Sequence, residues 1–164
     1  MRILFVYSSD RGYVRSWGEK LSQNFPDDFT AVDVKKGGAD VMPDNYDAVI
    51  LASSVHAGSA GKKFKKFCSS NAGMLLSKRI ILVLAGLQDN LTDKAFENNF
   101  SEALIDRAAG KIWIGGRIDP AQHNFFIRFL MKKISGKSGI ISSEKWETVD
   151  EAAGILKKMI KENK

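Results

Sequence analysis

Short apolar runs alternate along the chain with longer stretches in which apolar side chains recur at helical spacing. The apolar runs are bounded by turn residues and predict five strands, at residues 2–8, 29–35, 47–53, 79–85 and 111–116. The stretches of helical spacing predict helices at residues 13–25, 60–70, 92–109, 122–134 and 147–162. The segment between the second and third strands is short and is broken by Gly37, Gly38 and Pro43, so it leaves room for only a stub of helix.

The alternation of strands and helices predicts an α/β fold with parallel strands joined by crossover helices. The strands are nearly continuous apolar runs, as expected of a sheet that is covered on both faces. Five such strands fit either a doubly wound sheet of order 2-1-3-4-5 or one half of a Rossmann fold. In both folds the ligand binds beyond the carboxyl ends of the strands at the topological switch point. The loops after the first, third and fourth strands are therefore the candidate functional positions.

Length and composition favour one domain over residues 1–164, with residues 117–137 as a loop and basic helix inserted before the last helix. The apolar run at the N-terminus is too short for a signal peptide, and no apolar run reaches the roughly 18 residues of a membrane-spanning helix. These features predict a cytoplasmic protein. The lone cysteine, Cys68, without any Cys/His cluster, predicts that no structural metal is bound.

The loop after the first strand has residues suited to a phosphate group. It reads Ser8-Ser9-Asp10-Arg11-Gly12-Tyr13-Val14 and leads into a predicted helix. Small hydroxyl side chains with a glycine can form a backbone nest, often with a positive φ, and a helix N-terminus adds free N–H groups. The loop matches neither the dinucleotide nor the nucleoside triphosphate fingerprint. Serine and glycine at such a turn are also ordinary capping residues.

The loops after the third and fourth strands are polar and contain glycine. The third, at residues 53–59, could wrap a planar ring, and His56 within it could stack on that ring, donate a proton or lie in solvent. The fourth, at residues 85–90, allows close approach of a ligand to the backbone at Gly86, or is a turn followed by a helix cap. No acid/base pair stands out, so the sequence identifies no catalytic residue.

Several stretches of the chain together resemble a known family. They are the Ser8–Gly12 loop, residues 45–50 leading into 52–58, residues 115–120, residues 128–132 with Ser135-Gly136, and Lys145-Trp146-Glu147. Over nearly its whole length the chain resembles the flavodoxin superfamily. The late segments resemble the branch of menaquinone-dependent protoporphyrinogen IX dehydrogenases. The resemblance implies a flavodoxin-like, doubly wound, five-stranded parallel α/β sheet of order 2-1-3-4-5, with FMN bound non-covalently.

The resemblance also implies which residues hold FMN, with its phosphate on the first loop and the flavin against the third and fourth. They are Ser8, Ser9, Asp10, Arg11, Gly12, Tyr13, Val14, Ser54, Val55, His56, Ala57, Gly58, Ala85, Gly86 and Leu87. Two positions depart from the family. Val14 replaces a threonine whose hydroxyl would bind the phosphate, which removes about 1.5–3 kcal/mol unless Arg11 compensates. Ala57 lies near the usual site of a stacking aromatic residue, a role left to His56 or Tyr13.

Three functions stay open on the sequence. The resemblance implies an oxidoreductase of heme biosynthesis that uses FMN to oxidise protoporphyrinogen IX, with a quinone as electron acceptor and no nucleic-acid partner. The first alternative is an electron-transfer flavodoxin, although such carriers are usually acidic and this chain has a net charge of +6. The second is a flavodoxin-like module that no longer binds FMN, which Val14 and Ala57 keep open.

The late segment carries much of the positive charge. Residues 111–137 contain six basic side chains against one acidic side chain, Asp119. A basic amphipathic helix at residues 122–134 could lie on an anionic membrane, which would place the protein at the inner face of the membrane. The alternative is a helix packed on the sheet with Lys132 and Lys133 in water.

Overall fold

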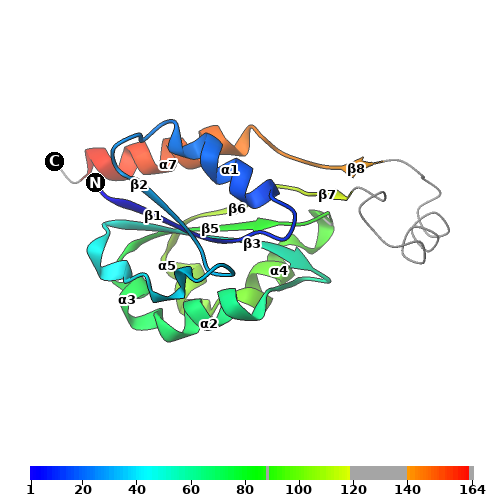
Figure 1. Cartoon of the computed structure of the whole chain (residues 1–164), viewed down its shortest axis with the longest axis horizontal. Coiled ribbons are helices and arrows are strands. Elements are labelled where there is room, and N and C mark those ends of the chain that lie inside the picture. The colour runs from blue at the N-terminus through cyan, green and yellow to red at the C-terminus, as the bar shows by residue number, and fades with distance from the viewer. Residues whose placement is uncertain (88, 119–139, 163–164) are drawn as a thin grey trace.

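The computed structural model describes residues 1–87, 89–118 and 140–162 (Figure 1). The predicted helix at residues 122–134, and with it the proposed membrane-binding face, lies outside the described residues. Among the described residues, no helix has the length and apolar character needed to cross a membrane.

Five parallel strands form the centre of the structure. They are β1 (Ile3–Ser8), β2 (Phe29–Asp33), β3 (Ala48–His56), β5 (Arg79–Ala85) and β6 (Ala108–Trp113). Their order is β2-β1-β3-β5-β6, and the two-residue strand β4 (Ser59–Ala60) pairs antiparallel with β3 off this path. Once β4 is set aside, this is the predicted order 2-1-3-4-5, so the predicted flavodoxin-like sheet is confirmed.

Helices cover both faces of the sheet, as the continuous apolar strands predict (Figure 1). One face carries α1 (Tyr13–Ser22) and α7 (Thr148–Lys161). The other carries α2 (Lys62–Ser70), α3 (Ala72–Leu76), α4 (Thr92–Asn99) and α5 (Glu102–Arg107). Between β2 and β3 the chain forms only 3-10 turns, at Gly38–Asp40 and Pro43–Asn45, which agrees with the predicted stub of helix.

Several predicted elements have different limits in the structure. The helix predicted at residues 92–109 is two helices, because Phe100 is extended and the Ser101 hydroxyl caps α5 by accepting from the Leu104 N–H at 3.4 Å. Strand β6 consequently begins at Ala108 rather than at residue 111. The polar residues after residue 53, predicted to be a loop, continue β3 to His56.

A small antiparallel ladder lies beyond the end of β6. It joins β7 (Arg117–Ile118) to β8 (Ile141–Ser142), on either side of the residues that are not described. The sequence predicts a loop for residues 117–121, because two-residue strands give no hydrophobic alternation to detect. The ladder fixes the position of Arg117 beside the carboxyl ends of the central strands.

Gly18 provides the close contact between α1 and the sheet. A Cβ atom at this position would lie 2.1 Å from the ring of Phe5 on β1, well inside van der Waals contact. On the same face, buried Trp17 donates its indole N–H to Thr148 Oγ1 of α7 at 3.0 Å. The packing of α1 against β1 and α7 therefore depends on the missing side chain at Gly18.

We predict that Gly18→Ala destabilises the protein although alanine favours helix. The clash with Phe5 should cost about 1–3 kcal/mol, which outweighs a gain of about 1 kcal/mol in helix propensity. Gly154→Ala on α7 is the matched control, because a Cβ there meets no described atom within 4 Å, and it should stabilise by about 0.5–1 kcal/mol. Urea unfolding followed by circular dichroism checks both, and a gain in stability for both variants would contradict the packing described.

Candidate functional site

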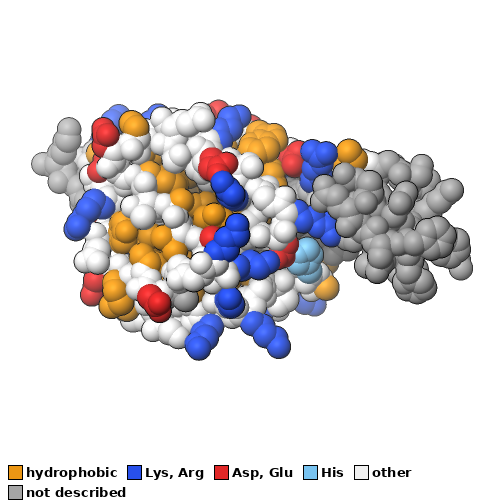
Figure 2. All heavy atoms as spheres, in the orientation of Figure 1, with side chains coloured by type: hydrophobic (Ala, Val, Ile, Leu, Met, Phe, Trp, Pro, Cys, Tyr) orange, Lys and Arg blue, Asp and Glu red, His pale blue; other side chains and the backbone are white. Residues whose placement is uncertain are grey.

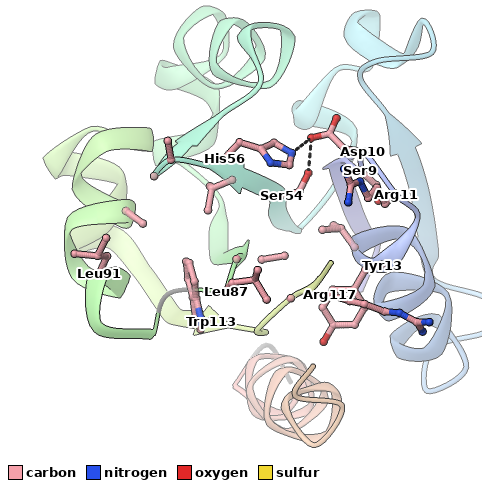
Figure 3. Close-up of a pocket in the computed structure, with 18 residues that line it drawn as sticks. Ser9, Asp10, Arg11, Tyr13, Ser54, His56, Leu87, Leu91, Trp113 and Arg117 are labelled. Atoms are coloured by element: carbon pink, nitrogen blue, oxygen red, sulfur yellow. Dashed lines mark hydrogen bonds and ion pairs between the residues drawn. The ribbon is translucent and has the colours of Figure 1, made fainter. Parts of the chain in front are cut away.

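A pocket of about 460 Å³ opens at the carboxyl ends of the central strands (Figure 3). It lies between the loops after β1, β3 and β5. The parallel register explains this position, because Ser8 at the end of β1 pairs with Ser53, and Ser54 on β3 pairs with Ala85 at the end of β5. The three loops predicted from the sequence thus lie around one cavity.

All the predicted site residues line this pocket except Ser8 and Gly12. Ser8 is buried beneath the first loop, and Gly12 starts the helix behind it. The structure adds five lining residues that the sequence did not indicate: Leu91, Ala95, Trp113, Gly116 and Arg117. They come from the 3-10 turn Asp89–Leu91, from α4, and from the segment that runs from the end of β6 to β7, and only the three-dimensional arrangement brings them to the loops.

The first loop presents donors, on Ser9 and at the start of α1, that bond to no other described residue. Gly12 is the N-cap of α1 with φ +86°, as a nest requires, and it brings no side chain to cap the first-turn N–H groups. The first helical bond of α1 runs from Ser16 N–H to the Gly12 carbonyl at 2.8 Å. The buried Ser9 hydroxyl has no hydrogen-bond partner among the described residues. An oxygen-rich anionic ligand would satisfy these groups.

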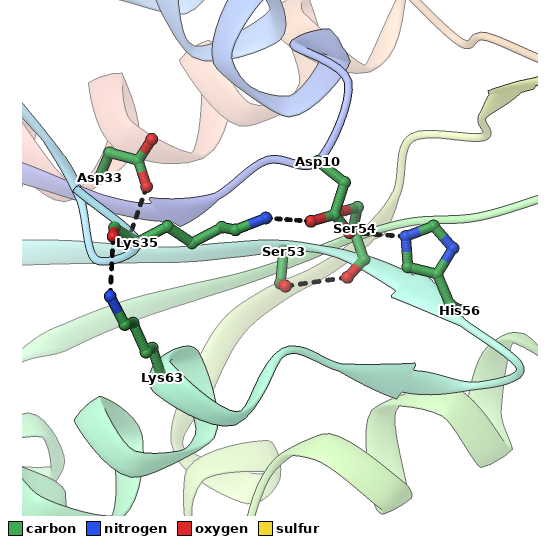
Figure 4. Close-up of polar contacts among 7 residues, drawn as sticks. All are labelled: Asp10, Asp33, Lys35, Ser53, Ser54, His56 and Lys63. Atoms are coloured by element: carbon green, nitrogen blue, oxygen red, sulfur yellow. Dashed lines mark hydrogen bonds and ion pairs between the residues drawn. The ribbon is translucent and has the colours of Figure 1, made fainter. Parts of the chain in front are cut away.

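Asp10 joins the first loop to two neighbouring strands (Figures 3 and 4). Its carboxylate forms an ion pair with Lys35, lies 2.6 Å from His56 Nε2 and accepts from Ser54 Oγ at 3.1 Å. Burial alone would raise the pKa of Asp10, but the bonds from Lys35, His56 and Ser54 together hold this pKa below its ordinary value. The negative charge of the loop is therefore matched by protein groups.

Tyr13 ties the same loop to the segments that follow β6 and precede α7. Its hydroxyl donates to the Ile114 carbonyl at 2.5 Å and accepts from the Lys145 N–H at 3.1 Å, and its ring meets Trp146 edge-on. Burial raises the pKa of Tyr13 to about 12, so the hydroxyl remains a donor across the neutral range. These contacts fix the ring against β6 and the start of α7.

The third loop begins as strand and closes in a tight hairpin, and its residues Ser54 to Gly58 line the pocket. Ala57 and Gly58, both with positive φ, form the two-residue turn between β3 and β4. Buried Asn99 fixes this turn, because it accepts from the Ala60 N–H at 2.7 Å and donates to the Gly58 carbonyl at 2.8 Å. His56, two thirds exposed, lies beside this turn at the mouth of the pocket (Figure 3).

Gly86 in the fourth loop lines the pocket, and the absence of a side chain there also makes room for its neighbours. A Cβ atom there would lie 2.6 Å from the indole of Trp113 and 3.0 Å from Val55 Cγ2. The Trp113 indole N–H donates to Asp89 Oδ1 at 2.7 Å, and Asp89 in turn pairs with Lys145 at 2.9 Å. Lys145 and Trp113 thereby hold the pKa of Asp89 below its ordinary value. The glycine makes room for Trp113, which forms one wall of the pocket.

We predict that Tyr13→Phe lowers the free energy of unfolding by about 1–3 kcal/mol, because the Ile114 carbonyl and the Lys145 N–H lose a shared partner. Tyr7→Phe on β1 is the control, since the Tyr7 hydroxyl makes no hydrogen bond within the described part of the chain, and it should change stability by less than about 0.5 kcal/mol. Chemical denaturation of the three proteins measures the difference. Equal losses for both variants would show that the Tyr13 hydroxyl is not an anchor.

Comparison with known proteins agrees with this geometry. The model of the flavodoxin domain family matches residues 4–140. No protein of curated function matches the sequence significantly. A flavodoxin from Streptococcus pneumonia TIGR4 is similar in structure, with a TM-score of 0.52 and 16% identity over 71% of this chain and 83% of that chain.

Two further solved structures are similar to this chain. A short-chain flavodoxin associated with a bacterial microcompartment has a TM-score of 0.51 and 11% identity, over 71% of this chain and 82% of its own. A Fusobacterium nucleatum flavodoxin bound to flavin mononucleotide has a TM-score of 0.49 and 14% identity, over 68% of this chain and 70% of its own. With the family model matched from the first strand to residue 140, this chain belongs to the flavodoxin domain family.

Proposed function

We propose that this protein binds FMN in the pocket and works as a flavin-dependent redox protein. The proposal rests mainly on the first loop. There a left-handed Gly12 and a Ser9 hydroxyl that has no partner in the described part of the chain precede the N-terminus of α1. In a chain of the flavodoxin domain family, this loop stands at the topological switch point, where such folds bind their ligands. The phosphate would accept from Ser9 and from the first-turn N–H groups of α1.

The rest of the pocket fits the isoalloxazine end of FMN. Its volume of about 460 Å³ falls within the range of ordinary cofactor sites, about 300–1,000 Å³. Apolar side chains from several segments line it, among them Val55 of β3, Leu87 after β5 and Trp113 of β6. Bound FMN would supply electron transfer, and the protein would orient the ring and exclude water from one side. The indole of Trp113 gives the pocket an aromatic wall, whereas Ala57 has no ring that could stack on the flavin.

We further propose that the redox substrate is an apolar, anionic small molecule of the protoporphyrinogen class, with a quinone as acceptor. The resemblance of the late segments to protoporphyrinogen dehydrogenases suggests this substrate. The pocket supports it through the apolar side chains of Leu87, Leu91 and Ala95 and the cationic Arg117 at β7. A simple electron carrier is the alternative. Comparing the rates of porphyrinogen oxidation and of one-electron transfer by the FMN-loaded protein distinguishes the two functions.

Two residues of the first loop count against FMN binding and are the argument for a module that has lost FMN. Val14 lacks the hydroxyl expected by resemblance, and Asp10 brings a negative charge to the loop that receives a phosphate. The ion pair with Lys35 and the bonds from His56 and Ser54 offset that charge, and Arg11 lines the same pocket. We therefore place FMN binding first, with an affinity lowered by Val14.

We predict that apo-protein quenches the fluorescence of added FMN and binds riboflavin far more weakly, because only FMN reaches the first loop with a phosphate. Gly12→Val should weaken FMN binding at least about tenfold, since a β-branched residue resists φ +86°. Gly37→Val is the matched control, with φ +97°, equally open surroundings among the described residues and no place in the pocket. Equal affinities for FMN and riboflavin would contradict the phosphate site.

We also predict that Val14→Thr tightens FMN binding by about ten- to a hundredfold, the value of one hydrogen bond to a charged group. The affinity for riboflavin should stay the same, because the new hydroxyl would serve only the phosphate. Fluorescence titration of wild type and variant with both flavins gives the ratio of their affinities for FMN and the ratio for riboflavin. A matching gain for riboflavin would mean that position 14 contacts the ring rather than the phosphate.

A further inference from the structure

A group of lysines lies on the surface beside the pocket. We call Lys35 and Lys36, which follow β2, and Lys62, Lys63, Lys65 and Lys66 of α2 the lysine patch. All are exposed except Lys65, which is half-buried. The chain contains no aspartate or glutamate from Ala48 to Gln88, so α2 itself carries no acidic side chain. Figure 2 shows this band of basic side chains next to His56.

The lysine patch adjoins the proposed FMN site directly. Lys35 forms its ion pair with Asp10 of the first loop, and Lys63 Nζ donates to the Lys35 carbonyl at 2.9 Å (Figure 4). Gly61, just before α2, lies so close to the first loop that a Cβ there would be 3.6 Å from Ser8 Oγ. A molecule bound on the lysine patch would therefore rest against the rim of the pocket.

The lysines oppose the stability of the helix that carries them. Lys62, Lys63 and Lys65 occupy the first turn of α2, which contains no acidic residue, and the helix dipole disfavours positive charge at that end. Lys62 and Lys66 are also four residues apart on one helix face, where like charges repel. A charge pattern that disfavours its own helix needs another reason, and binding an acidic surface is one.

The side chains of α2 indicate which kind of acidic partner the lysine patch binds: a membrane, a nucleic acid or a protein. The apolar side chains of α2, Phe64, Phe67 and Cys68, are all buried against the sheet, so the helix has no apolar face to insert into a membrane. Its exposed side chains are lysines and serines, without the aromatic rings on which nucleic-acid bases stack. Flexible, strongly hydrated lysines are suited to steering a charged protein into a brief encounter.

We propose that the lysine patch docks an acidic electron-transfer protein at the mouth of the pocket. This inference rests on the proposed binding of FMN in that pocket, and the docked carrier is a second electron donor to FMN besides the small-molecule substrate. In each encounter one electron passes from the reduced carrier to the bound FMN, so the carrier is oxidised and FMN is reduced by the same electron. The charge complementarity is the reverse of that expected for an acidic flavodoxin with a basic partner.

The test uses the full chain, with and without FMN, and labelled plant-type [2Fe–2S] ferredoxin as the acidic carrier. Fluorescence anisotropy measures binding at about 0.01 M and about 1 M salt, between which the Debye length falls from about 30 Å to about 3 Å. The test variant is Lys36→Gln/Lys62→Gln/Lys66→Gln, which leaves Lys35 and Asp10 intact. The control is Lys157→Gln/Lys158→Gln/Lys161→Gln on α7, with the same change in charge on the opposite face of the sheet.

We expect binding at low salt that weakens at least about tenfold at high salt and to a similar extent in the patch variant, while the α7 variant binds like wild type. Urea unfolding should show the patch variant to be at least as stable as wild type, so a loss of binding would not reflect misfolding. The rate of electron transfer from reduced ferredoxin to the FMN-loaded protein should fall in parallel.

Two results would overturn the proposal. Equal weakening in both triple variants would show that net charge alone is responsible. Patch-dependent binding of phosphatidylserine vesicles or of oligo-dT that exceeds the binding of ferredoxin would assign the surface to a membrane or to nucleic acid. Anisotropy of the apo-protein reports the surface even if the pocket holds no FMN, so failure of the docking proposal and failure of the proposed function give different results.

Discussion

The parallel register of β1, β3 and β5 is the constraint on which the site depends. It sets Ser8 beside Ser53 and Ser54 beside Ala85, so three chain segments separated by many residues end at one edge of the sheet. Each strand is apolar on both faces, and the helices that cover them leave this edge as the place where polar loops converge. The pocket is a consequence of this topology, and the side chains of the loops decide what it binds.

The loops are held in place by contacts among themselves and with distant segments. Asp10 joins the first loop to Lys35 and to His56 on β3. Tyr13 and Asp89 both reach Lys145, one through its backbone N–H and the other through its ammonium group. Asn99 fixes the turn after β3 from α4. Such a network orders the loops before a ligand arrives, which lowers the entropy that binding must overcome.

Basic side chains lie both in the first loop and on the surface beside it, in a chain whose net charge is +6. The first loop contains both Asp10 and Arg11, and the neighbouring surface carries the lysine patch. An anionic ligand therefore meets a loop whose one negative charge is already matched by Lys35. The same lysine links the cofactor loop to the surface on which we place the partner. The electrostatics of the pocket and of the docking surface are thus parts of one arrangement.

Much of the fold could be predicted from local sequence, because its strands are apolar runs bounded by turn residues. The strand at residues 79–85 was predicted with the limits that β5 has, and the flavodoxin-like order followed from the alternation of elements. The break between α4 and α5 was missed because Phe96, Phe100 and Leu104 keep helical spacing through it. The polarity of residues 53–56 suggested a loop, whereas pairing with β1, β4 and β5 makes them strand.

The candidate site could be predicted only in part, because local sequence signals do not reveal contacts between residues far apart in the chain. The first loop combines a glycine with small hydroxyl residues, a local signal, and Gly12 has the positive φ that this signal implies. The contacts of Trp113 with Asp89 and of Asp10 with His56 join residues 24 and 46 positions apart. Neither pair shows any spacing that a local pattern could reveal, so these contacts come only from the tertiary structure.

The central claim is that the first loop holds the phosphate of a flavin. The visible absorption spectrum of protein purified without added cofactor, followed by identification of what acid precipitation releases, tests this most directly. The account predicts a yellow protein with the absorption bands of oxidised flavin, and the release of FMN rather than riboflavin or FAD. A colourless protein that also fails to take up FMN, or one that releases only riboflavin, would contradict it.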